Sequence, residues 1–185
     1  LESFLRLTNL STNGKRVTVF GYGACGKGVA ANFRNAYAIV SVVERDPVLR
    51  LQALLDGYLV PGRDEALETA DVVITVTGAQ GVVTAADAPL LKPGAILANA
   101  GHFPWEIDAA GLAARGVTVL EGGHMVNLAG PRPLGNSIES MDLGFALQTR
   151  CLEAVATGAV GPEACVVPVP RAIDEAVAAA FVLTA

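Results

Sequence analysis

Short runs of β-branched and other apolar residues alternate along the chain with longer segments in which apolar residues recur three and four positions apart. The short runs are typical of buried strands, and the longer segments are typical of helices that bury one face. The predicted strands are residues 16–20, 39–44, 72–77, 95–99 and 117–121, with a weak strand at 58–60. The predicted helices are residues 26–35, 47–55, 64–69, 85–91, 108–114, 137–157 and 171–181.

This alternation predicts an α/β fold, namely a Rossmann-like doubly wound parallel sheet with helices on both faces in a single domain. A chain of 185 residues is long enough to bury a sizeable core. We expect residues 1–185 to form one dinucleotide-binding domain, with 1–14 as a lead-in segment and 137–185 as C-terminal helices that bridge toward another domain.

Residues 20–28 read F-G-Y-G-A-C-G-K-G, a G-x-G-x-x-G turn between a predicted strand and a predicted helix. Such a turn is typical of a site for the pyrophosphate of a dinucleotide. Gly21 permits the tight turn, Gly23 lets the backbone approach the phosphates, and Gly26 lets the helix pack against the strand. The free N–H groups of the helix N-terminus then face the phosphates. A plain tight turn between strand and helix is the alternative.

The predicted strand at 39–44 ends in Glu44, close to the offset of roughly 20 residues at which a carboxylate binds the adenosine ribose. A carboxylate suits the two ribose hydroxyls, whereas it repels the 2′-phosphate of NADP. NAD is therefore favoured. Arg45 keeps NADP open as an alternative, because a guanidinium pairs well with a 2′-phosphate.

Charge and composition exclude several classes of partner. A net charge of −5 argues against nucleic acid or an anionic membrane surface, and no apolar run reaches the roughly 18 residues of a membrane span. The three cysteines and two histidines lack metal-ligand spacing, so we expect no metal and, with free thiols, a cytoplasmic location. A chain with 52% hydrophobic and 17% charged residues indicates apolar surface covered by another domain or protomer, and we expect a homo-oligomer.

Several strings of the sequence resemble one known family. Residues 75–79 (T-V-T-G-A) and 99–103 (N-A-G-H-F) follow predicted strands, whose ends border the ligand crevice of a doubly wound sheet. With the glycine turn, these strings are similar to the NAD-binding domain of the S-adenosylhomocysteine hydrolase (adenosylhomocysteinase) family. Further strings that carry the resemblance are E-R-D-P at 44–47, D-G-Y at 56–58, G-H-F-P-W-E-I-D at 101–108 and V-N-L at 126–128.

The resemblance, which covers nearly the whole chain, implies an NAD cofactor and a role for each matching residue. It implies that the pyrophosphate is lined by Gly21, Gly23, Ala24, Cys25 and Gly26. It implies that Glu44 holds the adenosine ribose, with Arg45 beside it, and that the adenine and ribose are bordered by Thr77, Gly78 and Ala79. The residues implied toward the nicotinamide and the substrate are Ala100, Gly101, His102 and Asn127.

His102 follows a predicted strand in the crevice and is the candidate catalytic acid, base or gate; simple structural hydrogen bonding is the alternative. The resemblance implies the family's reaction. In that reaction the substrate ribose is oxidised at C3′ with tightly held NAD, a group is eliminated or added at the 5′ position, and the ketone is then reduced.

The family's substrate-binding domain is absent from these residues. We therefore expect the chain to bind NAD, and a small nucleoside substrate only together with that missing domain or a partner subunit, without turnover on its own. Whether the chain is itself an enzyme stays open. The alternative is a free-standing NAD-binding module that acts as a sensor or as a subunit of a separately encoded catalytic partner.

Overall fold

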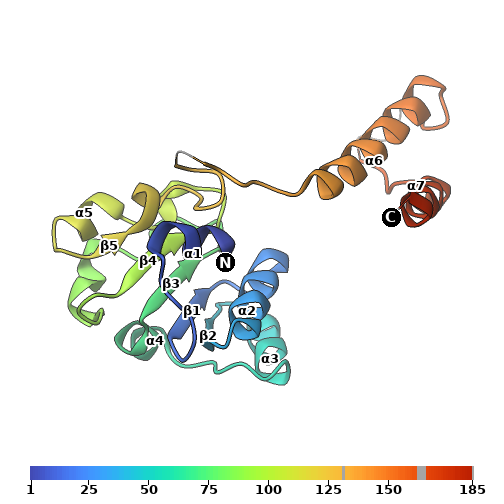
Figure 1. Cartoon of the computed structure of the whole chain (residues 1–185). Helices are drawn as coiled ribbons and strands as arrows, with labels where there is room; N and C mark the ends of the chain where they lie inside the picture. The colour runs from blue at the N-terminus through green and yellow to red at the C-terminus, as the bar shows by residue number, and fades with distance from the viewer. Residues whose placement is uncertain (131, 162–165, 185) are drawn as a thin grey trace. The chain divides into compact units, whose positions relative to one another are not determined.

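The computed structural model describes residues 1–130, 132–161 and 166–184 (Figure 1). The chain divides into two compact units, residues 1–134 and residues 135–185. Within the described residues, the first unit contains all the strands and the second contains two helices.

Five parallel strands form one sheet in the order β2-β1-β3-β4-β5 (Figure 1). The chain runs from β1 outward to β2 and then crosses back to place β3 on the other side of β1. The order in which the chain adds strands therefore reverses between β1 and β3, and Rossmann-type sheets open their ligand crevice at this point. The strands are β1 (Arg16–Phe20), β2 (Ile39–Val43), β3 (Val72–Thr75), β4 (Ile96–Asn99) and β5 (Thr118–Val119).

Helices and short 3-10 helices precede, connect and follow the strands. In the first unit these are α1 (Glu2–Thr8), α2 (Ala24–Asn35), α3 (Pro47–Leu55), α4 (Arg63–Thr69), η1 (Ala85–Leu90), η2 (Pro104–Glu106), α5 (Ala109–Ala113) and η3 (Leu120–Gly123). The start of α3 follows directly from sequence, because the Asp46 side chain accepts a hydrogen bond from the Val48 N–H (2.8 Å) and Pro47 occupies the first helical position.

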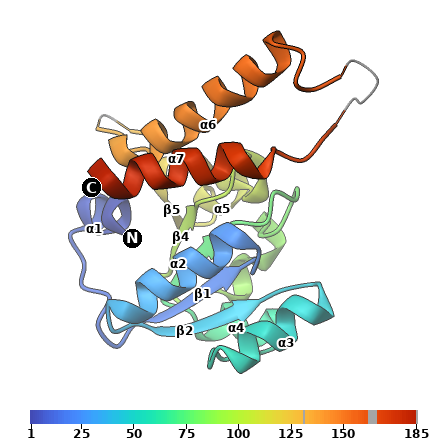
Figure 2. The same ribbon diagram turned by 90° about the vertical axis from the view of Figure 1, so that its right-hand side faces the viewer.

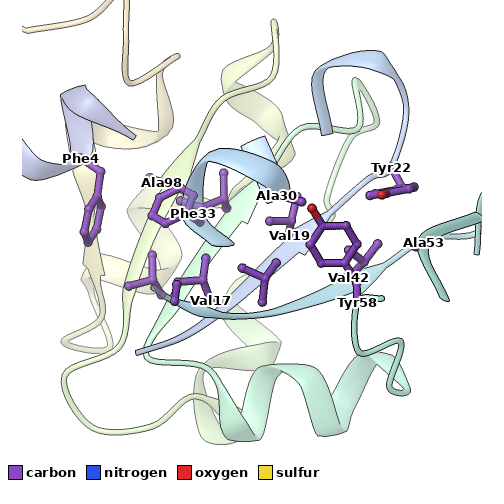
Figure 3. Close-up of a cluster of buried hydrophobic side chains, with 14 residues drawn as sticks. Phe4, Val17, Val19, Tyr22, Ala30, Phe33, Val42, Ala53, Tyr58 and Ala98 are labelled. Carbon is purple, nitrogen blue, oxygen red and sulfur yellow. The ribbon is translucent and has the colours of Figure 1, made fainter. Parts of the chain in front are cut away.

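Both faces of the sheet are covered by buried apolar side chains. Successive residues of a strand point to opposite faces, so neighbouring residues of one strand join different clusters. Val72 and Ile74 of β3 join a buried cluster that includes Phe33 of α2, shown in Figure 3. Val73, between them, joins a second cluster with Leu67 of α4. The predicted fold class, a parallel Rossmann-like sheet with helices on both faces, is confirmed.

Three predicted elements differ from the structure. The strand predicted at 58–60 is reduced to a single bridge between Leu59 and Ser41, and Pro61 just after it has no N–H to extend a ladder. The strand predicted at 117–121 ends at Val119, because Glu121 turns the chain with a φ of +49°. The helix predicted at 85–91 is a 3-10 helix that contains Pro89. Other boundaries shift by at most three residues.

The second unit consists of α6 (Ile138–Ala156) and α7 (Arg171–Thr184), which pack against each other (Figure 2). The N-cap of α6 is Ser137, whose hydroxyl accepts from the Ser140 N–H. Both helices occur where the sequence predicts them. Their predicted role as a bridge toward another domain stays a prediction.

Candidate cofactor site

A cleft of about 520 Å³ opens at the carboxyl ends of β1, β2 and β3. Six residues that sequence reasoning assigns to a cofactor line it together: Gly21, Gly23, Glu44, Arg45, Thr77 and Ala79. The other residues that line it are Phe20, Val43, Leu49, Arg63, Val76, Gln80, Gly81 and Val82. All of these lining residues come from residues 20–82.

The glycine turn has the geometry that its sequence predicts. Gly21 has a φ of +103°, and a Cβ atom there would lie 2.8 Å from the Val76 carbonyl oxygen. A Cβ atom on Gly26 would lie 2.1 Å from the Gly21 carbonyl oxygen, so only glycine lets α2 start this close to the turn. Around Gly23, by contrast, nothing lies within 4 Å of a Cβ position. The middle glycine is therefore open to a ligand while its neighbours are packed.

Helix α2 presents its N-terminus beside this open glycine. Gly23 is the N-cap, and no side chain caps the helix. Ala24 and Cys25, the first two helical residues, are exposed. Free N–H groups at the start of a 12-residue helix favour an anion, and a pyrophosphate fits that requirement.

Glu44 lies at the end of β2, and backbone hydrogen bonds fix its carboxylate. Oε2 accepts from the Tyr22 N–H at 2.7 Å, and Oε1 accepts from the N–H groups of Arg45 (2.6 Å) and Asp46 (2.9 Å). The side chain is half-buried on the cleft wall. One of these three bonds comes from the glycine turn itself, so the carboxylate and the turn are positioned as one unit.

Tyr22, between the first two glycines, anchors the turn from beneath. Its ring is buried and meets the Tyr58 ring edge-on at 5.7 Å between centroids. Its hydroxyl donates to Asp56 Oδ2 at 2.7 Å. Burial, followed by this hydrogen bond to a carboxylate, raises the pKa of Tyr22 well above its ordinary value. The phenol therefore stays protonated and keeps donating to Asp56.

Buried Glu106 organises the loop after β3. Its carboxylate accepts from the Thr77 N–H (2.8 Å), the Thr77 hydroxyl (2.8 Å) and the Gly78 N–H (2.7 Å). A Cβ atom on Gly101 would collide with Glu106 Oε1, so a larger residue where the loop after β4 passes over the carboxylate would displace that side chain from its hydrogen bonds. Sequence reasoning quoted Glu106 as part of a motif but assigned it no role. The signal in the sequence that pointed to a buried role was the position of this carboxylate between the apolar residues Trp105 and Ile107.

Arg63, the first residue of α4, is a cleft residue that sequence reasoning missed. Its guanidinium donates to both carboxylate oxygens of Asp87 (2.9 and 2.7 Å) and to the Val82 carbonyl oxygen (3.0 Å). Burial raises the pKa of Asp87, but the bonds from Arg63 and Thr84 outweigh burial and hold that pKa below its ordinary value. A cation in the first turn of a helix opposes the helix dipole, and this was the one signal in the sequence.

The residues predicted to approach nicotinamide and substrate follow β4 and do not line the cleft at β1–β3. Ala100 donates its N–H to the Thr75 carbonyl oxygen, and Gly101 donates its N–H to the Asn99 side chain. The exposed His102 ring meets Phe103 edge-on at 4.6 Å. Asn127 follows Val126, whose N–H donates to the Asn99 carbonyl oxygen, so that loop also reaches the end of β4. Their roles stay predictions.

Within residues 1–130, 132–161 and 166–184, no group of three or more histidine, cysteine, aspartate or glutamate side chains is arranged to hold a metal ion. In the same described residues, no helix combines the length and apolar character needed to cross a membrane.

The sheet order, the packed glycine turn and the carboxylate at the end of β2 define a Rossmann-type dinucleotide-binding domain. Solved structures agree on the fold. A dipicolinate synthase structure from Bacillus halodurans aligns with a TM-score of 0.59 and 24% identity, over 64% of this chain and 42% of that chain. A phosphoglycerate oxidoreductase from Vibrio cholerae aligns with a TM-score of 0.52 and 21% identity, over 57% of this chain and 35% of that one.

Residues 1–129 match the family described as S-adenosyl-L-homocysteine hydrolase, NAD binding domain, and the chain belongs to this family. An adenosylhomocysteinase from Thermococcus kodakarensis is 39% identical over 96% of this chain and 46% of its own length. An S-inosyl-L-homocysteine hydrolase from Methanopyrus kandleri is 38% identical over the same shares. The chain thus spans about half the length of these curated relatives. The predicted family is confirmed, and the cofactor is NAD.

Proposed function

We propose that this chain is the NAD-binding part of a hydrolase that cleaves the thioether of S-adenosylhomocysteine or a closely related nucleoside. The glycine turn and Glu44 would hold NAD, and NAD would supply reversible hydride transfer at C3′ of the substrate ribose. The family membership supports the reaction class. Two relatives of nearly equal identity are named for adenosyl and for inosyl substrates, so the proposal covers both purine bases.

The observation that carries the proposal is the fixed Glu44 carboxylate beside the open Gly23. Three backbone N–H groups orient the carboxylate before any ligand arrives, so it needs little rearrangement to accept bonds from the ribose hydroxyls. The pyrophosphate then lies over Gly23 and the N-terminus of α2. A 2′-phosphate would meet the carboxylate, so we propose that the site takes NAD in preference to NADP.

A Glu44→Gln substitution tests this assignment. It keeps the shape of the side chain but removes the charge, and losing charged hydrogen bonds of this kind costs about 1.5–3 kcal/mol. We expect NAD binding, measured by calorimetry, to weaken accordingly and the preference over NADP to disappear. Glu68→Gln is the matched control, because Glu68 is exposed on α4 outside the cleft. Equal affinity of the unaltered chain for NAD and NADP would refute the role of Glu44.

We propose further that these 185 residues do not hydrolyse the thioether by themselves, since the relatives named as hydrolases are about twice as long. The purified chain with NAD and S-adenosylhomocysteine should release no homocysteine above background. Release that disappears in a His102→Asn variant would overturn this proposal and assign the catalytic role to His102.

A free-standing NAD-binding module is the second candidate, and one observation favours it: the residues that line the cleft all come from residues 20–82, and the side chains that hold them, Asp87 and Glu106, belong to the same unit of the chain. Either candidate also fits self-association. The helix α6 leaves Ile138, Leu152 and Val155 more than half exposed, and apolar surface of this kind is commonly covered by a second copy. We propose a homodimer. Light scattering across a concentration series would refute it by giving the monomer mass throughout.

A further inference from the structure

We infer that Arg63 determines how the site recognises the adenine base: its guanidinium, held in place by Asp87, supplies a flat surface on which adenine stacks. This inference rests on the proposed orientation of NAD in the cleft. It goes beyond that proposal because it assigns the base to a residue outside the glycine turn, the ribose carboxylate and the loops after β3 and β4.

The order of groups in a dinucleotide locates the adenine. If the pyrophosphate lies at Gly23 and the adenosine ribose lies at Glu44, the base must lie beyond Glu44, farther from the glycine turn. The cleft lining that remains for it includes Arg45, Leu49 and Arg63, with residues 80–82 of the loop after β3. Among these side chains, Arg63 is the one that ion pairing holds within the described structure.

The bonds of Arg63 decide which part of its guanidinium is free. Nη1 and Nη2 donate to the two oxygens of Asp87. Nη1 also donates to Asp64 Oδ1 at 3.3 Å, and Nη2 also donates to the Val82 carbonyl oxygen. Asp87 is itself fixed, because its Oδ2 accepts from the N–H and the hydroxyl of Thr84. Hydrogen bonds of this kind lie in the plane of the guanidinium. The Arg63 side chain is nevertheless 40% exposed. In-plane bonds leave the flat face of the guanidinium uncovered, and this face is the surface assigned to the base.

The flat face of a guanidinium stacks well on a purine ring, and stacking needs no particular hydrogen-bonding edge of the base. Because Asp87 neutralises Arg63, the guanidinium provides no uncompensated charge for a 2′-phosphate. Arg63 therefore favours the adenine ring without favouring NADP over NAD. A purely structural role would be to tie α4 to η1, and such a role would not distinguish one ligand from another.

The test compares ligands with and without the base. In Arg63→Met, we expect the Kd of NAD and of ADP, measured by calorimetry, to rise about tenfold, as for loss of a favourable stacking contact of a cation. Inorganic pyrophosphate, which competes for the glycine turn and has no base, should keep its Kd, measured by competition with NAD. Arg63→Lys retains a positive charge beside Asp87 but has no planar group, so it should also bind NAD and ADP more weakly.

Lys92→Met is the matched control, because Lys92 pairs with Asp71 as a surface ion pair whose members do not line the cleft. It should leave all three affinities unchanged. Unaltered NAD affinity in Arg63→Met, or an equal loss for pyrophosphate, would overturn the inference about Arg63 and leave NAD binding intact. Failure of the unaltered chain to bind NAD would instead refute the proposed site itself.

Discussion

The two units of the chain use similar amphipathic helices with opposite results. In residues 1–134, α2 buries Ala30 and Phe33 against the sheet, and two apolar clusters fill both faces. In residues 135–185, α6 is longer than any helix of the first unit yet has no buried residue. In the described part of α7, only Val177 is buried.

The difference lies in the partner surface and not in the helices. A helix gains most of its stability in a protein by packing its apolar stripe against another surface. The sheet offers α2 a broad surface, whereas α6 and α7 within their unit have only each other. Helical periodicity therefore predicts that a stripe exists but not how much of it is buried.

The strongest contrast should come from removing the same kind of side chain in each unit. Leu97→Ala empties a fully buried position of β4 and should lower the free energy of unfolding by about 2–5 kcal/mol. Leu152→Ala on α6, where the side chain is 69% exposed within one chain, should change it by less than about 0.5 kcal/mol when the protein is dilute enough to be monomeric. Urea unfolding of the monomer measures both. A large loss in monomeric Leu152→Ala would contradict the contrast between the units, whereas a loss that appears only as the protein concentration rises is the result expected of the proposed homodimer.

Glycine-to-alanine substitutions should have opposite signs in the two units. Gly26→Ala drives a methyl group against the Gly21 carbonyl oxygen, so we expect a loss of about 1–3 kcal/mol and weakened NAD binding. Gly144→Ala on α6 meets nothing within 4 Å and should stabilise the helix by about 0.5–1 kcal/mol. Thermal melting with and without NAD measures both. A neutral Gly26→Ala would show that the glycine turn has room to relax.

A smaller effect concerns the ion pairs of the two units, whose contributions to the free energy of unfolding should depend differently on pH. The pKa of Asp87 lies below its ordinary value of 3.8 in the folded chain, so its pair with Arg63 stabilises the fold above about pH 4 and loses that effect as the pH falls through the lowered pKa. Asp87→Asn should therefore cost about 1 kcal/mol at pH 7, discounted for the partly exposed Arg63, and less near pH 3.

Glu153→Gln is the control in the second unit, since the pair of Glu153 with Arg150 is more than half exposed on both sides. It should change the free energy of unfolding by only a few tenths of a kcal/mol. Urea unfolding at the two pH values measures both variants. A cost for Asp87→Asn that stays the same at pH 3 would contradict the assigned source of its stabilisation.

The elements and the candidate cofactor turn were predictable from the amino-acid sequence. The strand at 16–20 and the helix at 47–55 occur at their predicted residues, because a short apolar run and an Asp-Pro helix start act on neighbours in the chain. The roles of Gly21 and Gly26 were also predictable, since a strand-turn-helix of this length needs glycines at that spacing.

The distant groups that support the cleft are defined by the folded chain and not by local sequence. Glu106 accepts hydrogen bonds from Thr77 and Gly78. Arg63 donates to the carboxylate of Asp87, which lies in a segment beyond β3. Such partners depend on the order of strands in the sheet, which hydrophobic periodicity does not encode. A buried carboxylate and a paired guanidinium look like ordinary charged residues in the sequence, because only folding removes water from them and brings their partners within reach.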